Sequence, residues 1–229
     1  MRRHWQRSDG NLVEVAVTTR VDGDFHIDAE PEALAARRDS VLAGPWSVVR
    51  QVHGSTVVEA NPASTPEADG IFTDVVGRVI GVQGADCSPI AFITSEGPIG
   101  VVHAGWRGLA AGVIGQMATT LTDRGAAIER VLVGPTICVD CYEFGAEDLD
   151  VVAAALGEAV RAATPSGTPA LDLMAGIELS CEAHGLGPIE ALGGCTSCNA
   201  DEFFSHRARQ EPQRHALAMR ITTPTADDT

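Results

Sequence analysis

Residues 81–108, GVQGADCSPIAFITSEGPIGVVHAGWRG, contain two apolar runs that lead into reactive side chains. The run at residues 79–82 leads into Cys87, and the run at residues 99–102 leads into His103. Short β-branched runs bounded by glycine are typical of buried strands. Two such strands, ending in a thiol and an imidazole, predict that these two groups meet at one place in the fold.

A third apolar run, at residues 47–52, ends in the same way at His53. Imidazole nitrogen and thiolate sulfur bind zinc in a tetrahedral shell, and three protein ligands leave a fourth position for water or substrate. Zinc in such an open site lowers the pKa of a bound water to about 7. The residues alone leave one alternative open, in which both histidines lie in ordinary turns and Cys87 is a small buried apolar group.

Composition limits the classes of partner. The chain has 229 residues, a formal net charge of −15 and a pI of about 4.7. An acidic surface argues against binding to nucleic acid or to an anionic membrane. The basic segment 1–7 is not followed by an apolar stretch, and no run is long enough to cross a bilayer. We therefore expect a cytoplasmic protein whose six cysteines are thiols, ligands or buried apolar groups.

Helical and strand patterns alternate along the chain, which predicts an α/β or α+β domain with a mixed sheet. Apolar runs predict strands at residues 12–17 (half-buried), 47–52, 56–60, 79–82, 99–102, 131–133 and 189–192. Helical patterns cover residues 31–42, 109–121, 146–163 and 172–184. We expect one domain over residues 1–229, with a polar, frayed tail after about residue 222.

Several short motifs follow one another in a fixed order. They are QVHG at 51–54, ADG at 68–70, ADCSP at 85–89, HAGWRG at 103–108, GPTI at 134–137, CYEFG at 141–145, CT at 195–196 and FFSHR at 203–207. With these motifs the chain resembles the YfiH-like laccase-domain family, whose members are also called multicopper polyphenol oxidase domain proteins. HAGWRG with an upstream ADCxP is highly specific to that family.

The resemblance implies a single α/β domain that forms an α/β/β/α sandwich with mixed sheets. It implies that His53, Cys87 and His103 bind one zinc ion per chain at the active site. The activity it implies is phosphorolysis of adenosine, inosine and methylthioadenosine, together with deamination of adenosine. The expected partners are then a purine nucleoside and phosphate, and we expect a monomer or a weak homodimer.

Further residues are candidates for moving protons and binding phosphate. Asp86 is the carboxylate nearest in sequence to a predicted zinc ligand, and a carboxylate normally carries the proton in deamination. Phosphorolysis passes through a cation-like sugar and calls for arginine or backbone N–H groups around the phosphate. Arg107 precedes a predicted helix N-terminus, which favours an anion. Arg207, Arg20 and Arg214 are further candidates, and each arginine has the alternative of a structural ion pair.

Two CxxC pairs, Cys138 with Cys141 and Cys195 with Cys198, resemble zinc knuckles. The gap between the pairs is much longer than the roughly 15 to 20 residues of a zinc ribbon. Cys141 and Cys195 also match family positions that need no metal. We therefore expect no second zinc, and the metal content per chain is the deciding measurement.

Three other functions compete with the nucleoside chemistry. A copper-dependent polyphenol oxidase is one, but seven histidines without a His-x-His pair are few for several coppers, so copper is less expected than zinc. A hydrolase with Cys87 as nucleophile and His103 as base is another. The third is a metal-stabilised scaffold protein without catalysis. Incubation with adenosine, with and without phosphate, separates these alternatives.

Overall fold

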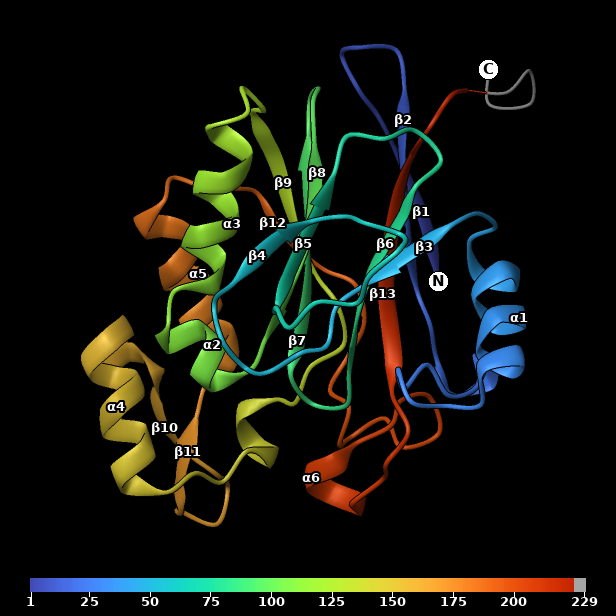
Figure 1. Cartoon of the computed structure of the whole chain (residues 1–229). Helices are drawn as coiled ribbons and strands as arrows, with labels where there is room; N and C mark the ends of the chain where they lie inside the picture. Colours follow the sequence, from blue (N-terminus) through green and yellow to red (C-terminus); the bar gives the residue numbers. More distant parts are fainter. Residues whose placement is uncertain (225–229) are drawn as a thin grey trace.

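The computed structural model describes residues 1–224, which form four layers (Figure 1). One helix covers a five-stranded sheet, this sheet packs on a six-stranded sheet, and a group of helices covers the other side. The α/β/β/α sandwich that the resemblance implies is therefore confirmed. Of the tail expected to fray, residues 225–229 lie outside the described residues.

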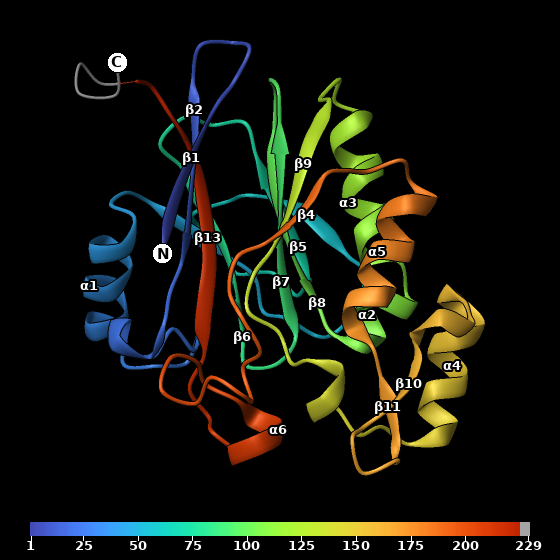
Figure 2. The same cartoon turned by 180° about the vertical axis from the view of Figure 1, so that it is seen from behind.

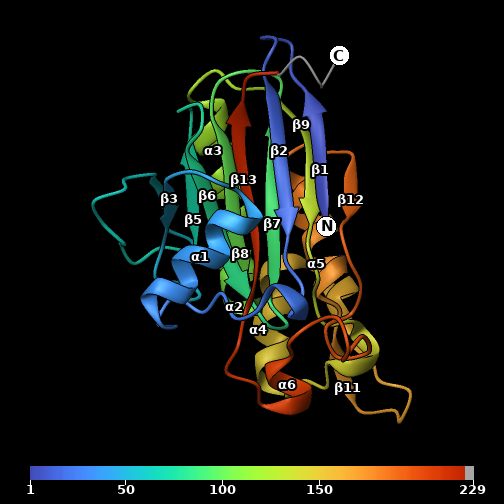
Figure 3. The ribbon, with the colours of Figure 1, turned by 90° about the vertical axis from the view of Figure 1, so that its right-hand side faces the viewer.

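The first sheet has the strand order β1-β2-β13-β6-β3 and is mixed, because β3 alone pairs in parallel. Its strands are β1 (Arg2–Gln6), β2 (Leu12–Val17), β13 (His215–Thr222), β6 (Val79–Gly84) and β3 (Trp46–Val48). The helix α1 (Pro31–Val41) covers its outer face, where Leu34 packs in one cluster with Ala218 (Figure 3).

The second sheet has the order β12-β9-β7-β8-β5-β4 and is also mixed. Its strands are β12 (Ile189–Ala191), β9 (Ile128–Val133), β7 (Ser88–Thr94), β8 (Ile99–Ala104), β5 (Gly70–Thr73) and β4 (Val57–Glu59). The helices α2 (Trp106–Ala110), α3 (Val113–Thr122) and α5 (Leu173–Ala183) lie on its outer face, and α4 (Ala146–Leu156) packs on α2 and α5 beside β11 (Pro169–Leu171) (Figure 2).

Short elements complete the chain. They are the two-stranded sheet of β10 (Arg161–Ala163) and β11 (Pro169–Leu171), the helix α6 (His206–Arg209), and the 3-10 turns η1 (Arg20–Asp22), η2 (Val139–Cys141) and η3 (Glu158–Val160). No helix within residues 1–224 has both the length and the apolar character that a membrane crossing requires.

The core between the two sheets explains their apolar runs. Ile80 and Met219 of the first sheet pack in one cluster with Val101 and Leu132 of the second. Each such side chain contributes about 1.5–3 kcal/mol when it is fully buried. The expectation that residues 12–17 are only half-buried is wrong, because all six are buried. Their one charged member, Glu14, is paired with Arg220 at 2.6 Å.

Backbone turns that require glycine account for two corrections to the predicted helices. The helix predicted at 109–121 is divided into α2 and α3, because Gly112 adopts a φ of +82°. The helix predicted at 146–163 ends at Leu156, where Gly157 has a φ of +110°, and β10 follows. In addition, the strand predicted at 47–52 stops at Val48, so His53 lies in a loop.

Candidate functional site

The fold brings His53, Cys87 and His103 together. Cys87 lies in the turn between β6 of the first sheet and β7 of the second, while His103 is the residue before the end of β8. One ligand atom from each of the three lies within 4.8 Å of the others. Cys87 Sγ is 4.0 Å from His53 Nε2, and the two imidazole rings meet edge to face at 4.9 Å. We call these three residues the His–Cys–His cluster.

Asp69 is the carboxylate behind this cluster. It is fully buried just before β5, and its Oδ1 lies 2.9 Å from His103 Nδ1. This contact leaves His103 Nε2 as the nitrogen that can bind a metal, and a carboxylate in this position fixes the ring and raises its basicity. Sequence reasoning assigned Asp69 no role, although the ADG motif at residues 68–70 pointed to it.

The same carboxylate also shapes the loop that carries His53. The backbone N–H groups of Val52, His53 and Gly54 donate to Asp69 at 3.2, 3.0 and 2.6 Å. His53 has a φ of +61°, a conformation uncommon for a residue other than glycine. Asp69 therefore stabilises a strained turn that presents the exposed His53 to the two other members of the cluster.

Cys87 and His103 shift each other's pKa in opposite directions. Burial opposes ionisation of the Cys87 thiol, but the charge of His103 and hydrogen bonds from both histidines lower its pKa to about 6. Burial likewise opposes the charging of His103, but the Cys87 thiolate and Asp69 raise its pKa to about 9. Cys87 is therefore a thiolate at neutral pH, which is the form that binds metals and acts as a nucleophile.

These residues fit zinc. Two imidazoles and a thiolate, one imidazole held by a buried carboxylate, form a three-ligand set with an open fourth position. Gly105 leaves room for the side chains of Cys87 and His53 in this set. A Cβ at position 105 would lie 2.9 Å from Cys87 Sγ and 3.0 Å from His53 Cδ2.

The cluster lies on the wall of a pocket of about 400 Å³. Small-molecule sites usually have volumes of roughly 300–1,000 Å³. Apart from the cluster and short backbone segments, the pocket is lined by His26, Gln51, Gln83, His206 and Arg214. A ligand in this pocket therefore meets the open side of the cluster together with one arginine and two further histidines.

Asp86 lies beside the cluster in sequence, but its carboxylate is buried and hydrogen-bonded elsewhere. Oδ1 accepts from the hydroxyl groups of Thr196 and Ser205, both at 2.6 Å, and Oδ2 accepts from the backbone N–H of Arg207 at 2.6 Å. Asp86 does not line the pocket, and its φ is +102°. Its contacts join the turn that carries Cys87 to residues 196–207.

The four candidate arginines lie in different surroundings. Arg214 lines the pocket of the cluster. Arg107 is exposed over the Trp106 ring, and Arg207 donates to the carbonyl of Glu143 and lines a separate pocket of about 530 Å³.

Arg20 donates to the carbonyls of Ala200 and Phe203 and pairs with Glu211 at 2.7 Å. It lines neither of the two pockets. Of the four arginines, Arg214 alone lines the pocket of the cluster. Its Nη1 donates to the carbonyls of residues 211–213, which leaves its other guanidinium nitrogens without a hydrogen-bond partner among residues 1–224. Arg20 holds two chain segments together.

Tyr142 is a buried phenol whose pKa responds to the charges of the cluster and of the two remaining arginines. Burial, followed by the negative charge of Cys87, raises the pKa of Tyr142 above its usual value. The charges of Arg107 and Arg207 act on the same phenol in the opposite direction, and the Arg207 guanidinium lies 4.8 Å from its ring centroid. The phenol of Tyr142 therefore keeps its proton at neutral pH.

Comparisons with known proteins show which sequences and which fold this chain resembles. The family model described as multi-copper polyphenol oxidoreductase laccase matches residues 4–221. A purine nucleoside phosphorylase of Pseudomonas aeruginosa is 33% identical over 224 residues, which cover 89% of this chain and 91% of the relative. The adenosine deaminase RL5 of an unknown prokaryotic organism is 31% identical over 158 residues, covering 66% of this chain and 60% of that protein. The crystal structure of YlmD from Geobacillus stearothermophilus superimposes with a TM-score of 0.78 and 26% identity, covering 97% of both chains.

Proposed function

The chain belongs to the multi-copper polyphenol oxidoreductase laccase family, and from this premise we propose that it is a purine nucleoside phosphorylase that also deaminates adenosine. Membership confirms the resemblance to the YfiH-like laccase-domain family. The single observation that carries the proposal is the convergence of His53, Cys87 and His103, backed by Asp69, on the wall of a pocket large enough for a nucleoside.

We propose that His53, Cys87 and His103 hold a zinc ion. When bound, zinc supplies Lewis-acid polarisation of an oxygen or nitrogen atom at its open position. The chain's own contribution is to keep Cys87 ionised, to fix the ring of His103 through Asp69, and to aim His53 through its strained turn. These three effects prepare the ligands before any substrate arrives.

Phosphorolysis requires positive charge around the phosphate that attacks the anomeric carbon of the nucleoside. We propose that Arg214 supplies this charge, since it lines the same pocket as the cluster. Arg107 and Arg207 are proposed as a second pair of positive charges near the phenol of Tyr142. Arg20 is proposed as a structural residue, because its guanidinium is already occupied by two carbonyls and Glu211.

Proton transfer during deamination falls, in this proposal, to the histidines that line the pocket. His26 and His206 both face the space in which a base would lie. Asp86 is assigned a positioning role, because its two oxygens accept from three donors and it does not reach the pocket. It holds the backbone of Arg207 next to the cluster.

Two of the competing functions can be weighed against the same geometry. Several coppers require many histidines, but within residues 1–224 the only histidines that belong to a metal-ligating group are His53 and His103. The ionised Cys87 beside His103 does resemble the nucleophile and base of a cysteine hydrolase. The phosphorylase and deaminase relatives favour nucleoside chemistry over that alternative.

The test is an incubation of the purified protein with adenosine, with and without phosphate. Adenine with ribose 1-phosphate indicates phosphorolysis, and inosine indicates deamination. His103→Ala is expected to remove both activities, while His4→Ala, on the exposed edge strand β1, leaves them unchanged. Oxygen-dependent oxidation of a phenol without any nucleoside product would replace the proposal with the oxidase.

A further inference from the structure

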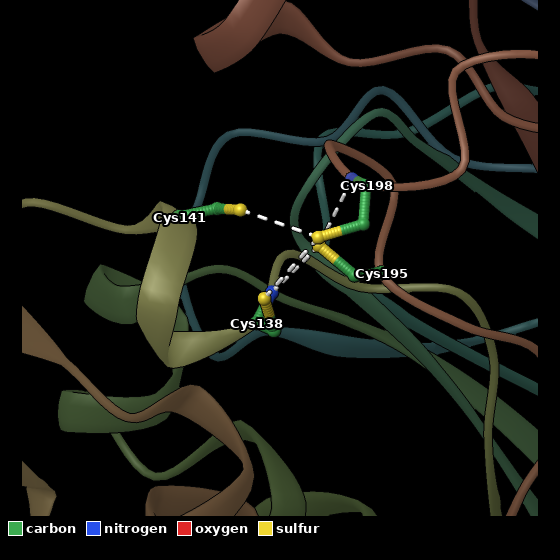
Figure 4. Close-up of side chains that lie close together, drawn as sticks. All are labelled: Cys138, Cys141, Cys195 and Cys198. Carbon is green, nitrogen blue, oxygen red and sulfur yellow. Dashed lines mark hydrogen bonds between the residues drawn. The ribbon is translucent and has the colours of Figure 1, made fainter. Parts of the chain in front are cut away.

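The fold brings the two CxxC pairs together, although they are far apart in the sequence (Figure 4). Cys138 and Cys141 lie at η2, which follows β9, and Cys195 and Cys198 lie in the loop after β12. The four sulfur atoms all lie within 4.8 Å of one another, with Cys198 Sγ 3.5 Å from Cys141 Sγ and 3.9 Å from Cys138 Sγ. We call these residues the four-cysteine cluster.

These separations suit one metal ion. Zinc–sulfur bonds of about 2.3 Å in a tetrahedron place the sulfur atoms about 3.8 Å apart. The expectation of a single zinc per chain relied on the long gap between the pairs, and the fold removes that argument. β9 and β12 pair in parallel, so the segments that leave these strands run side by side and meet at their cysteines.

Backbone groups favour the thiolate form of one member of the cluster, Cys195. The N–H groups of Cys138 and Cys198 both donate to Cys195 Sγ, at 3.2 and 3.4 Å. Such bonds stabilise the charged form of a sulfur ligand. Thr136 forms a bridge with Cys195, and the N–H of Thr196 donates to the carbonyl of Thr136 at 3.2 Å. The loop geometry is thus fixed by contacts that do not involve the sulfur atoms themselves.

An arginine that is ion-paired with Glu211 at 2.9 Å also holds the loop of the second cysteine pair. Arg209 donates to the carbonyls of Thr196 and Ser197, which lie between the two cysteines of the second pair. All six cysteines are free thiols, and Cys181 is fully buried in α5, away from the cluster. A closed set of four sulfur ligands without a further donor is the arrangement of structural zinc sites.

We propose that the four-cysteine cluster binds a structural zinc ion, in addition to the metal proposed for the His–Cys–His cluster. This ion joins the segment after β9 to the loop after β12. That loop continues into Thr196, Ser205 and Arg207, the three residues that hold Asp86 next to Cys87. The zinc therefore stabilises the part of the chain on which the position of Arg207 depends.

Metal content per chain tests this proposal independently of catalysis. We expect about two zinc ions in the wild type, about one in Cys198→Ser and about one in His103→Ala, because each variant removes one ligand from one cluster. Cys181→Ala is the matched control and retains about two, since it removes a cysteine outside the cluster. If Cys198→Ser does not fold, the wild type and His103→Ala still decide the matter.

X-ray absorption at the zinc edge identifies the remaining site in His103→Ala. We expect a shell of sulfur alone at about 2.3 Å. Nitrogen in that shell, no metal in this variant, or iron or copper in place of zinc would overturn the proposal. So would two zinc ions in Cys198→Ser. A wild type that binds this zinc but converts no nucleoside would instead count against the proposed function alone.

Discussion

The two groups of metal-ligating side chains differ in their donors, their access and their support. The His–Cys–His cluster has mixed donors, opens onto a pocket and is backed by the carboxylate of Asp69. The four-cysteine cluster has sulfur donors only and is backed by backbone N–H groups. An incomplete donor set beside a cavity suits a reaction, whereas a complete donor set between two loops suits stability.

The two clusters are also built from different parts of the fold. The first lies where the two sheets are joined, and its histidine loop is fixed by Asp69. The second depends on two loops beyond the strands β9 and β12. Asp86 connects the regions, because it precedes Cys87 and accepts from Thr196, the residue after Cys195. The same chain thus keeps a proposed reactive metal site and a proposed structural one within one hydrogen-bonded unit.

The largest expected effect comes from His103→Ala. This change removes a ligand of the His–Cys–His cluster, and Lewis-acid catalysis worth several kcal/mol corresponds to a loss of about 10³-fold in kcat/KM. The variant should still fold, because Asp69 keeps three backbone donors, but its melting temperature should fall because Asp69 loses a buried partner. Steady-state kinetics with adenosine and phosphate measure kcat/KM, and thermal unfolding measures the melting temperature. Retention of full activity would show that the cluster is not the reactive one.

Asp69→Asn should give the next largest effect. Carboxylates that orient a metal-bound histidine typically contribute 10–100-fold to metal affinity or activity. An amide in place of the carboxylate also points N–H groups at the donors of the His53 loop. Zinc competition with a chelator should show weaker binding at the His–Cys–His cluster and unchanged binding at the four-cysteine cluster. Equal weakening of zinc binding at both clusters would mean that Asp69 does not act specifically on the His–Cys–His cluster.

The convergence of His53, Cys87 and His103 could be predicted from the sequence because each follows a short apolar run. Local signals did not reveal Asp69, whose role depends on a hydrogen bond to a residue 34 positions away. The role of Asp86 also depends on contacts that are distant in the sequence. Its nearness to Cys87 suggested a proton carrier, but its carboxylate accepts hydrogen bonds from Thr196, Ser205 and Arg207.

The meeting of the cysteine pairs is a property of the sheet and could not be read from their spacing. It requires β9 and β12 to lie side by side, and Ile189 to pair with Val131. Predictions from spacing apply to metal sites in which one short loop joins the two pairs. Helix breaks at Gly112 and Gly157 were missed because a glycine inside an apolar pattern does not reveal its φ angle.

Asp86→Asn should affect stability more than chemistry. The amide nitrogen faces donors on this loop, so a buried hydrogen bond is lost and the free energy of unfolding falls by about 1–3 kcal/mol. Asparagine tolerates the positive φ of this position, so backbone strain is not a confounding effect. Denaturant unfolding measures the change. A shifted pH–rate profile of kcat/KM with normal stability would instead identify Asp86 as a proton carrier.

The smallest expected effect belongs to Thr196→Val, which tests whether the two regions are coupled. The change removes a buried hydroxyl that donates to Asp86 but leaves the sulfur ligands in place. Ser205 Oγ still serves the same oxygen, so we expect a loss of about 1 kcal/mol in the free energy of unfolding and unchanged zinc content.

Ser205→Ala is the matched control for the lost hydroxyl, and it should be more destabilising because Ser205 also accepts from the N–H of Ala208 at the start of α6. The decisive measurement is a double-mutant cycle of Thr196→Val with Cys198→Ser. If zinc at the four-cysteine cluster holds Thr196 against Asp86, removing the zinc already weakens that hydrogen bond. The loss of stability in the double variant should then be smaller than the sum of the two single losses by more than about 0.5 kcal/mol. Additive losses would mean that the loop reaches Asp86 without help from the metal, and that the two regions are neighbours rather than one unit.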